Sequence, residues 1–150
     1  MDLQKGLTRF LDAQNQDYLK ALAEMKAGKK ISHWIWYIFP QLRGLGFSDI
    51  SKFYGINGPE EAVAYITHPV LGRHLIDITT ELLQTQGKTA TDIFGAPDDM
   101  KFRSCMTLFA NVPNANPVFE AALDKYFIGL QDELTLQLLL REKWTAHQGE

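Results

Sequence analysis

The sequence predicts an all-α fold, a single irregular multi-helix domain over residues 1–150 with at most minor extended segments. Three observations predict it. Apolar residues recur at intervals of three and four, most clearly at Leu71, Leu75, Ile78 and Leu82, which places them on one face of a helix. Glycine and proline punctuate the chain between such segments. No two runs of alternating β-branched residues are joined by a hairpin turn.

The N-terminal part is expected to hold one clear helix and a shorter piece before it. Asp17 is a suitable N-cap for a helix with Tyr18, Leu22 and Met25 on one face, closed by Gly28. Upstream, the apolar residues of segment 7–11 predict another short helical turn. We therefore expect a break in the helix near residue 17.

The run from His33 to Phe39 is ambiguous by composition. Its aromatic and β-branched residues favour a strand. Ser32 before it, as a cap, and Pro40 after it favour a helix. We interpret the run as a short buried helix.

Each later helix has a recognisable starting signal, either a capping side chain or a proline in the first turn. The caps are Ser48, Thr89 and Asp132, and the prolines are Pro59 and Pro117. A further helix can start at Asp98 or Asp99. The expected helical segments are 49–54, 59–68, 71–86, 90–93, 117–128 and 132–140. The helix that starts at residue 98 or 99 is expected to turn Phe102, Met106 and Phe109 inward. From about residue 141 the chain is polar, and we expect this tail to fray.

Length, charge and composition exclude several classes of protein. A chain of 150 residues is long enough to bury roughly 70% of its unfolded surface, and its nine Phe, five Tyr and three Trp predict a bulky core. A net charge of −3 without clustered Lys and Arg argues against nucleic-acid binding. Cys105 stands alone and the four His lack metal-ligand spacing, so no disulfide, metal or cofactor is expected.

Targeting and membrane signals are not found in the sequence. The N-terminus lacks the apolar segment of a secretory signal. The longest apolar run, 34–39, is far shorter than the ~18 residues that span a bilayer. We therefore expect a soluble, cytoplasmic protein without a membrane partner.

Segment 32–48 carries a recognisable motif, SHWIWYIFPQLRGLGFS. It resembles the family catalogued as domain of unknown function 1810, whose members have a similar S-H-W-x-W-x-I-F-P-Q-L-x-G-L-G-x-S block. The likeness continues at 54–56, 61–62, 68–72, 101–109 and 129–135, and Cys105 departs from it where the family more often has Ser. The resemblance implies no biochemical activity. Some relatives bear a calpastatin label, but a core this aromatic is expected to fold, unlike a disordered inhibitor.

The same block carries chemistry of its own. Gly44 and Gly46 lead up to the expected cap Ser48, with Arg43 beside them. Backbone N–H groups exposed by a glycine-rich approach to a helix attract anions. An ordinary turn explains the same glycines without any ligand.

Aromatic side chains and a histidine add to this candidate pocket. Trp34 and Trp36 are able to stack on a planar base, and His33 can carry a proton near neutral pH. Clustered aromatic residues are more often core residues, however, and a histidine beside a cap is more often structural. The sequence leaves both interpretations open.

A second cluster is predicted on the helix that begins at Asp98 or Asp99. Asp98, Lys101 and Ser104 share one helical face. A lysine held against an apolar wall can lose its proton and act as a nucleophile or base. A solvated Asp98–Lys101 ion pair is the simpler interpretation.

Two functional hypotheses follow. The first is a site for a small anionic ligand, such as a nucleotide or an ADP-ribose-like molecule, in a domain that is either a binding protein or an enzyme. Its catalytic candidates are Lys101, His33 and Ser104, and its ligand-binding candidates are Trp34, Trp36, Gln41, Arg43, Gly44 and Gly46. The second is a non-catalytic interaction module that presents the aromatic block to a protein or to a second copy. Oligomeric state stays open.

Overall fold

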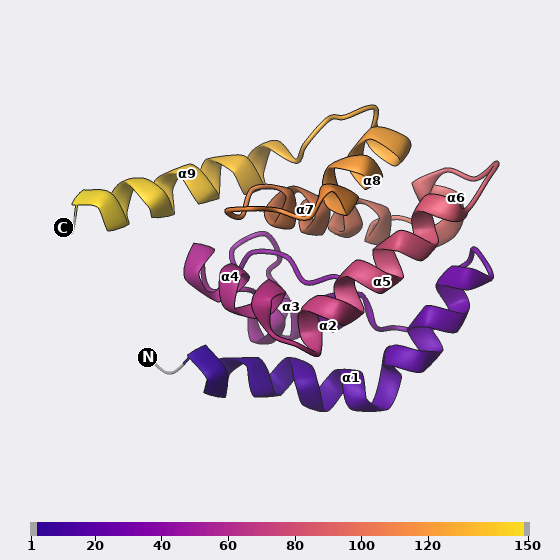
Figure 1. Ribbon diagram of the computed structural model, residues 1–150, viewed down its shortest axis with the longest axis horizontal. Helices are drawn as coiled ribbons and strands as arrows, with labels where there is room; N and C mark the ends of the chain where they lie inside the picture. Colours follow the sequence, from indigo (N-terminus) through magenta and orange to yellow (C-terminus); the bar gives the residue numbers. More distant parts are fainter. Residues whose placement is uncertain (1–2, 149–150) are drawn as a thin grey trace.

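The secondary structure of the chain is helical, as the sequence predicts (Figure 1). A computed structural model describes the backbone of residues 3–148 and the side chains of residues 3 and 5–141. Within these residues no strand forms, and β-type pairing is limited to an isolated parallel bridge between Leu42 and Ile56. The helices are α1 (Leu3–Lys26), α2 (Ile35–Ile38), α3 (Asp49–Tyr54), α4 (Pro59–Thr67), α5 (Leu71–Gln84), α6 (Ala90–Phe94), α7 (Asp98–Ala110), α8 (Pro117–Phe127) and α9 (Glu133–Gln148).

The expected break near residue 17 was wrong, because α1 is one helix of 24 residues. No Gly or Pro interrupts residues 7–26, so the backbone has no local reason to stop. Asp17 lies inside the helix, where its carboxylate accepts a hydrogen bond from the Tyr37 hydroxyl and lies 3.9 Å from Lys20 Nζ. Figure 1 shows that α1 changes direction about halfway along its length.

The expected short buried helix in the aromatic block is confirmed as α2, which ends before Pro40. Its predicted cap was wrong. Trp34 occupies the N-cap position without a side-chain cap, and the Ser32 hydroxyl instead donates to Glu24 Oε2 at 2.7 Å. The reason is tertiary, since a carboxylate from α1 competes for the serine.

Several other helix starts are confirmed. Ser48 accepts the N–H of Ser51, Thr89 forms a capping box with Asp92, and proline opens both α4 and α8. Asp132 Oδ2 accepts the backbone N–H of Thr135 at 2.9 Å and its hydroxyl at 2.6 Å. The backbone of α9 continues to Gln148, past the end expected near residue 140.

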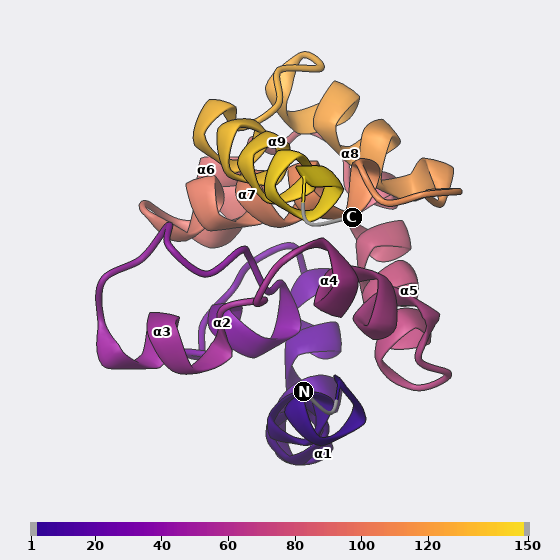
Figure 2. The ribbon, with the colours of Figure 1, turned by 90° about the vertical axis from the view of Figure 1, so that its left-hand side faces the viewer.

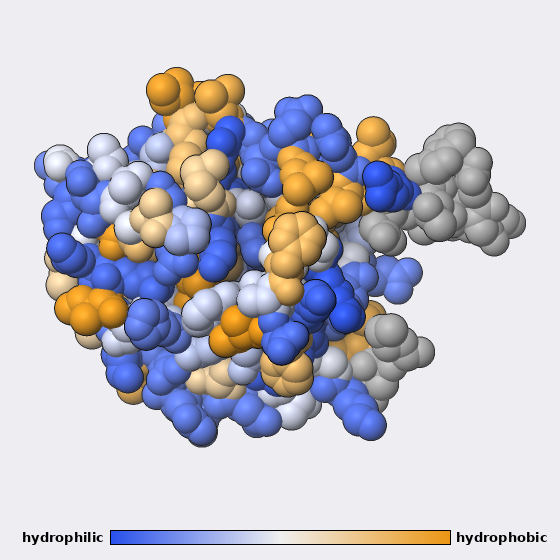
Figure 3. Space-filling view, turned by 180° about the vertical axis from the view of Figure 1, so that it is seen from behind, coloured by the Kyte–Doolittle hydropathy of each residue, from blue (hydrophilic) through white to orange (hydrophobic). Residues whose placement is uncertain are grey.

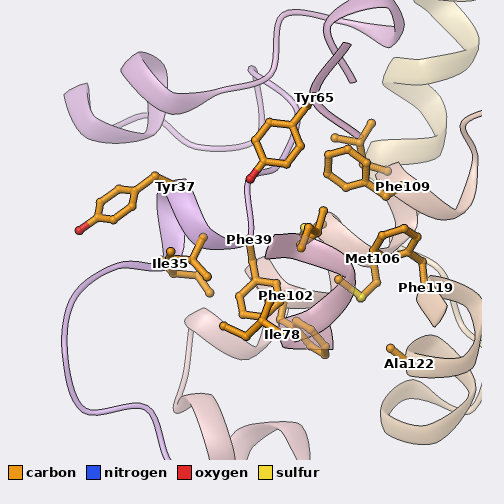
Figure 4. Close-up of a cluster of buried hydrophobic side chains, with 14 of the residues drawn as sticks. Ile35, Tyr37, Phe39, Tyr65, Ile78, Phe102, Met106, Phe109, Phe119 and Ala122 are labelled. Carbon is orange, nitrogen blue, oxygen red and sulfur yellow. The ribbon is translucent and has the colours of Figure 1, made fainter. Parts of the chain in front are cut away.

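Helix α5 packs against α1, α4 and α8, and α7 packs against α6, α8 and α9. Figure 2 shows α6–α9 on one side of the molecule and α1–α4 on the other. The inward face of α5 is buried as predicted, and so are Phe102, Met106 and Phe109 of α7. Phe39 of the aromatic block packs edge-on against Phe102 at 5.1 Å between ring centres (Figure 4). This contact fixes α2 to α7 and so brings two distant sequence motifs together.

None of the helices within residues 3–148 combines the length and the apolar composition needed to cross a membrane.

Candidate functional site

A narrow hollow lies where α2, α3 and α7 meet, and we call it the α2–α3–α7 hollow. It has an empty volume of about 230 Å³ out to its mouth. Its enclosed part has room for about one water molecule. The lining residues are Ile35, Trp36, Phe39, Gln41, Ser51, Tyr54, Gly55 and Lys101. The fold therefore brings together three predicted site residues, Trp36, Gln41 and Lys101, from two separate motifs.

Gly46 adjoins this hollow without lining it. A Cβ at this position would lie 2.6 Å from Ser51 Oγ and 3.6 Å from Gln41 Nε2. A larger residue would therefore push Ser51 towards the hollow. Gly55 has a similar steric role, because a Cβ there would lie 2.7 Å from the backbone of Arg43.

The indole N–H of Trp36 is enclosed and has no hydrogen-bond partner among the described residues. Leaving a buried donor unsatisfied costs roughly 1–3 kcal/mol. The Nζ atom of Lys101 lies over the same ring, 5.2 Å from its centre. Two lining residues of the hollow thus bring an unsatisfied donor and a cation to the same indole ring.

Lys101 belongs to an ion cluster with one carboxylate and two ammonium groups. The expected Asp98–Lys101 ion pair is confirmed, with 3.6 Å between Lys101 Nζ and Asp98 Oδ1. Asp98 Oδ2 lies closer to Lys30 Nζ, at 2.9 Å, and the Lys30 side chain is only 6% exposed. Asp98 is therefore shared, and its shorter contact is with Lys30.

The two lysines differ in their other contacts. Lys30 Nζ also donates to the backbone oxygen of Ser32 at 2.6 Å. Lys101 has the long ion pair and the Trp36 ring, with no hydrogen-bond acceptor for its N–H donors among the described side chains and backbone. Of the two, Lys101 is the more available to a ligand.

Trp34 does not lie where it could stack on a ligand. It is fully buried in the core, and its indole N–H donates to Glu24 Oε1 at 3.0 Å. Lys30 Nζ lies 5.0 Å from its ring centre, on the Glu24 side of the cluster. Trp34 therefore supports the loop before α2 and does not reach the hollow.

Glu24 organises that loop. Burial opposes ionisation of its carboxylate, but hydrogen bonds from the backbone of Ser32 and Ile31 and from the side chains of Ser32 and Trp34 lower its pKa to about 2. The two backbone N–H donors lie 2.9 Å and 2.7 Å from Oε1. The ionised carboxylate is thus part of the folded structure.

The other catalytic candidates lie outside the hollow. His33 is exposed and does not line it. Ser104 is 6% exposed, and its hydroxyl donates to the Met100 carbonyl on its own helix at 3.1 Å. Of the three residues predicted to act catalytically, Lys101 alone lines the α2–α3–α7 hollow as the structure describes it.

Arg43 and Gly44 line a second hollow with an empty volume of about 510 Å³. Its other lining residues are Leu42, Ile56, Asn57, Gly58 and Leu138. Arg43 Nη1 donates to Asn57 Oδ1 at 3.3 Å. The two hollows share the paired segments 41–43 and 55–57, which are joined by the hydrogen bonds Arg43 N–H to Ile56 O and Ile56 N–H to Gln41 O, both 2.9 Å.

Sequence reasoning missed Lys30, Ser51 and Tyr54 as neighbours of the site. Ser51 and Tyr54 lie in α3, and Tyr54 also falls in a matched family segment. The sequence therefore held information that could have indicated these two residues. Lys30 carried none, because no local spacing indicates that a loop lysine will meet the start of α7. No group of three or more His, Cys, Asp or Glu side chains able to hold a metal occurs among the described residues.

The arrangement of helices and motifs can now be compared with known proteins. Residues 4–139 match the family model described as "Protein of unknown function (DUF1810)", and the chain belongs to this family. The fold is similar to the crystal structure of the conserved hypothetical protein Rv1873 from Mycobacterium tuberculosis. The two chains are 47% identical with a TM-score of 0.88, and the match covers 89% of this chain and 96% of the other. A comparison with curated proteins gives no match.

Proposed function

We propose that this protein binds a small anionic ligand and that the charged group of the ligand enters the α2–α3–α7 hollow. The observation that carries the proposal is the unsatisfied indole N–H of Trp36, whose ring centre lies 5.2 Å from the Lys101 ammonium in the lining of the hollow. An acceptor that carries negative charge would satisfy both the donor and the cation. A nucleotide or an ADP-ribose-like molecule is the class of ligand that we favour.

Further donors face the same hollow. The Gln41 amide and the Ser51 hydroxyl line it, and Ser51 Oγ accepts from Ser48 Oγ at 2.9 Å, which leaves the Ser51 proton to donate elsewhere. Because the enclosed part holds about one water, the base or sugar of a ligand stays at the mouth. Entry of a carboxylate or phosphate group requires the flexible Lys101 and Gln41 side chains to move.

The proposal concerns binding and includes no reaction. Two of the three catalytic candidates, His33 and Ser104, do not line the hollow. Lys101 is thus assigned to ligand binding, as the partner of the anionic group.

Ligand titrations followed by thermal shift and tryptophan fluorescence test the proposal, with ADP-ribose, AMP, inorganic phosphate and benzoate as probes. At least one probe should raise the melting temperature at concentrations well above its Kd. Lys101→Gln should weaken its binding roughly tenfold or more, because a charge-assisted hydrogen bond is lost. Trp36→Phe should weaken it roughly threefold and remove the fluorescence response.

Lys125→Gln is the matched control, because Lys125 lies on α8 over the ring of Tyr126 and away from the hollow. It changes the net charge by the same amount and should leave binding unchanged. Equal weakening in both lysine variants, or no stabilisation by any probe, contradicts the proposal.

A protein–protein interaction module is the second candidate, and exposed aromatic residues favour it. Most of the aromatic block is buried, but Phe47 is 85% exposed and Phe53 of α3 is 60% exposed. Figure 3 shows that hydrophobic side chains stand among hydrophilic ones on the face of the molecule opposite to that of Figure 1. Light scattering over a concentration series tests self-association, and the double variant Phe47→Ser/Phe53→Ser should abolish any concentration-dependent rise in mass.

A further inference from the structure

Asp98 limits the positive charge that the α2–α3–α7 hollow presents to a ligand. Its two oxygens face two different ammonium groups, Lys30 at 2.9 Å and Lys101 at 3.6 Å. An anion that binds Lys101 is attracted by that lysine and repelled by the carboxylate behind it. This repulsion grows with the charge of the ligand, because Coulomb energy is proportional to each charge.

Other carboxylates near this cluster are already occupied by hydrogen-bond donors. Glu24 accepts hydrogen bonds from the backbone of Ile31 and Ser32 and from the Trp34 indole. Asp99 accepts from the Thr91 hydroxyl at 2.7 Å and from the Met100 N–H at 2.8 Å. Asp98 is therefore the carboxylate in direct ion-pair contact with the lysine that lines the hollow.

We infer that Asp98 is a specificity-determining residue, which lowers the preference of the hollow for dianionic phosphate monoesters over singly charged head groups. The inference rests on the proposed function. Carboxylates and phosphodiesters carry one negative charge, as does each inner phosphate of an ADP-ribose-like molecule, whereas a monoester carries almost two at pH 8. Lys30 acts as a positioning residue, since it holds Asp98 and offsets its charge.

Paired probes of equal shape and different charge test the selectivity of the wild-type protein. Benzoate and phenyl phosphate form the carboxylate arm, and cyclic AMP and AMP form the phosphodiester arm, all at pH 8 and constant ionic strength. In at least one pair the dianion should bind less than about tenfold tighter than its singly charged counterpart. Dianions bound more than about tenfold tighter in both arms would overturn the inference.

Two variants with opposite expected signs separate a charge effect from a structural one. Asp98→Asn should tighten binding of the singly charged probe about threefold. It should tighten binding of the dianion about tenfold, because doubling the charge of the ligand squares the factor. Lys30→Met should weaken both probes, again with the larger change for the dianion. A residue with a merely structural role would weaken all probes alike in both variants, and that result would also overturn the inference.

The failure of the inference is distinguishable from failure of the proposed function. If the wild-type protein binds none of the four probes or ADP-ribose, the proposed function fails and the inference fails with it. If it binds them with dianions preferred more than about tenfold in both arms, or Asp98→Asn leaves the ratio of the two affinities unchanged in a protein with a wild-type circular dichroism spectrum, only the role of Asp98 is refuted.

Discussion

Two tryptophans of one short motif, Trp34 and Trp36, have opposite surroundings. Trp34 is fully buried, and its N–H donates to a carboxylate that three other donors also hold. Trp36 is partly exposed, and its enclosed N–H has no acceptor among the described residues. A lysine lies over each ring, Lys30 over Trp34 and Lys101 over Trp36.

The difference shows how a repeated residue type can divide between structure and function. Around Trp34 the indole N–H, the Ser32 hydroxyl and the Lys30 ammonium all have protein partners, which is what a buried network needs for stability. Around Trp36 a donor is left over, and such groups are uncommon in folded proteins. The comparison therefore links the Glu24–Trp34 region to stability, and the Trp36–Lys101 region is where we propose that a ligand binds.

The largest expected effect is on the Glu24 side. Glu24→Ala removes the acceptor of two backbone N–H groups, a hydroxyl and an indole N–H. Several buried donors then lose their partner, so the free energy of unfolding should fall by about 3–5 kcal/mol. Urea denaturation measures it. A loss below about 1 kcal/mol would contradict the view that Glu24 organises this loop.

Acid should protonate the same carboxylate, that of Glu24, and so lower the free energy of unfolding. The pKa of Glu24 is lowered from 4.5 to about 2 on folding, so its contribution to stability is complete above pH 4.5 and is lost as the pH falls towards 2. The free energy of unfolding should fall by about 2–3 kcal/mol across that window, beyond what other carboxylates contribute. Chemical denaturation of wild type and Glu24→Gln at pH 2 to 6 measures it, and parallel curves for the two proteins would contradict the assignment.

Trp34→Phe should have an intermediate effect. The substitution removes one hydrogen bond to a buried carboxylate and leaves a gap where the larger ring was. A loss of about 2–3 kcal/mol in the free energy of unfolding is expected. Thermal and urea melts measure it, and a neutral result would remove the distinction between the two tryptophans.

Trp36→Phe should have the smallest effect on the free protein. It removes a donor that has no partner, so the loss of packing is offset by relief of an unsatisfied group. The free energy of unfolding should change by less than about 1 kcal/mol. The same melts measure it. A loss as large as that of Trp34→Phe would mean that the Trp36 N–H has a stabilising partner in solution, such as an ordered water.

Local sequence signals predicted much of the fold. The apolar face of α5, the caps Ser48, Thr89 and Asp132, and the prolines of α4 and α8 needed only nearest-neighbour information. The predictions for Asp17 and Ser32 failed for different reasons. The helix runs through Asp17 because no Gly or Pro interrupts it, whereas the Glu24 carboxylate binds the Ser32 hydroxyl across the fold.

The candidate site was predictable only in part. Trp36, Gln41 and Lys101 were singled out by residue type and do line one hollow, whereas Arg43 and Gly44 line the neighbouring one. The sharing of Asp98 between Lys30 and Lys101 joins the loop after α1 to the start of α7, which are almost seventy residues apart. No periodicity or spacing reports such a contact.

The sequence by itself determined the helices and the family, because capping, proline and 3.6-residue periodicity are local properties and the motif is written along the chain. Tertiary structure alone decided which tryptophan is core and which borders a hollow. Both have the same side chain and nearly the same neighbours in sequence, but burial, available acceptors and ion pairs depend on distant segments that packing brings together.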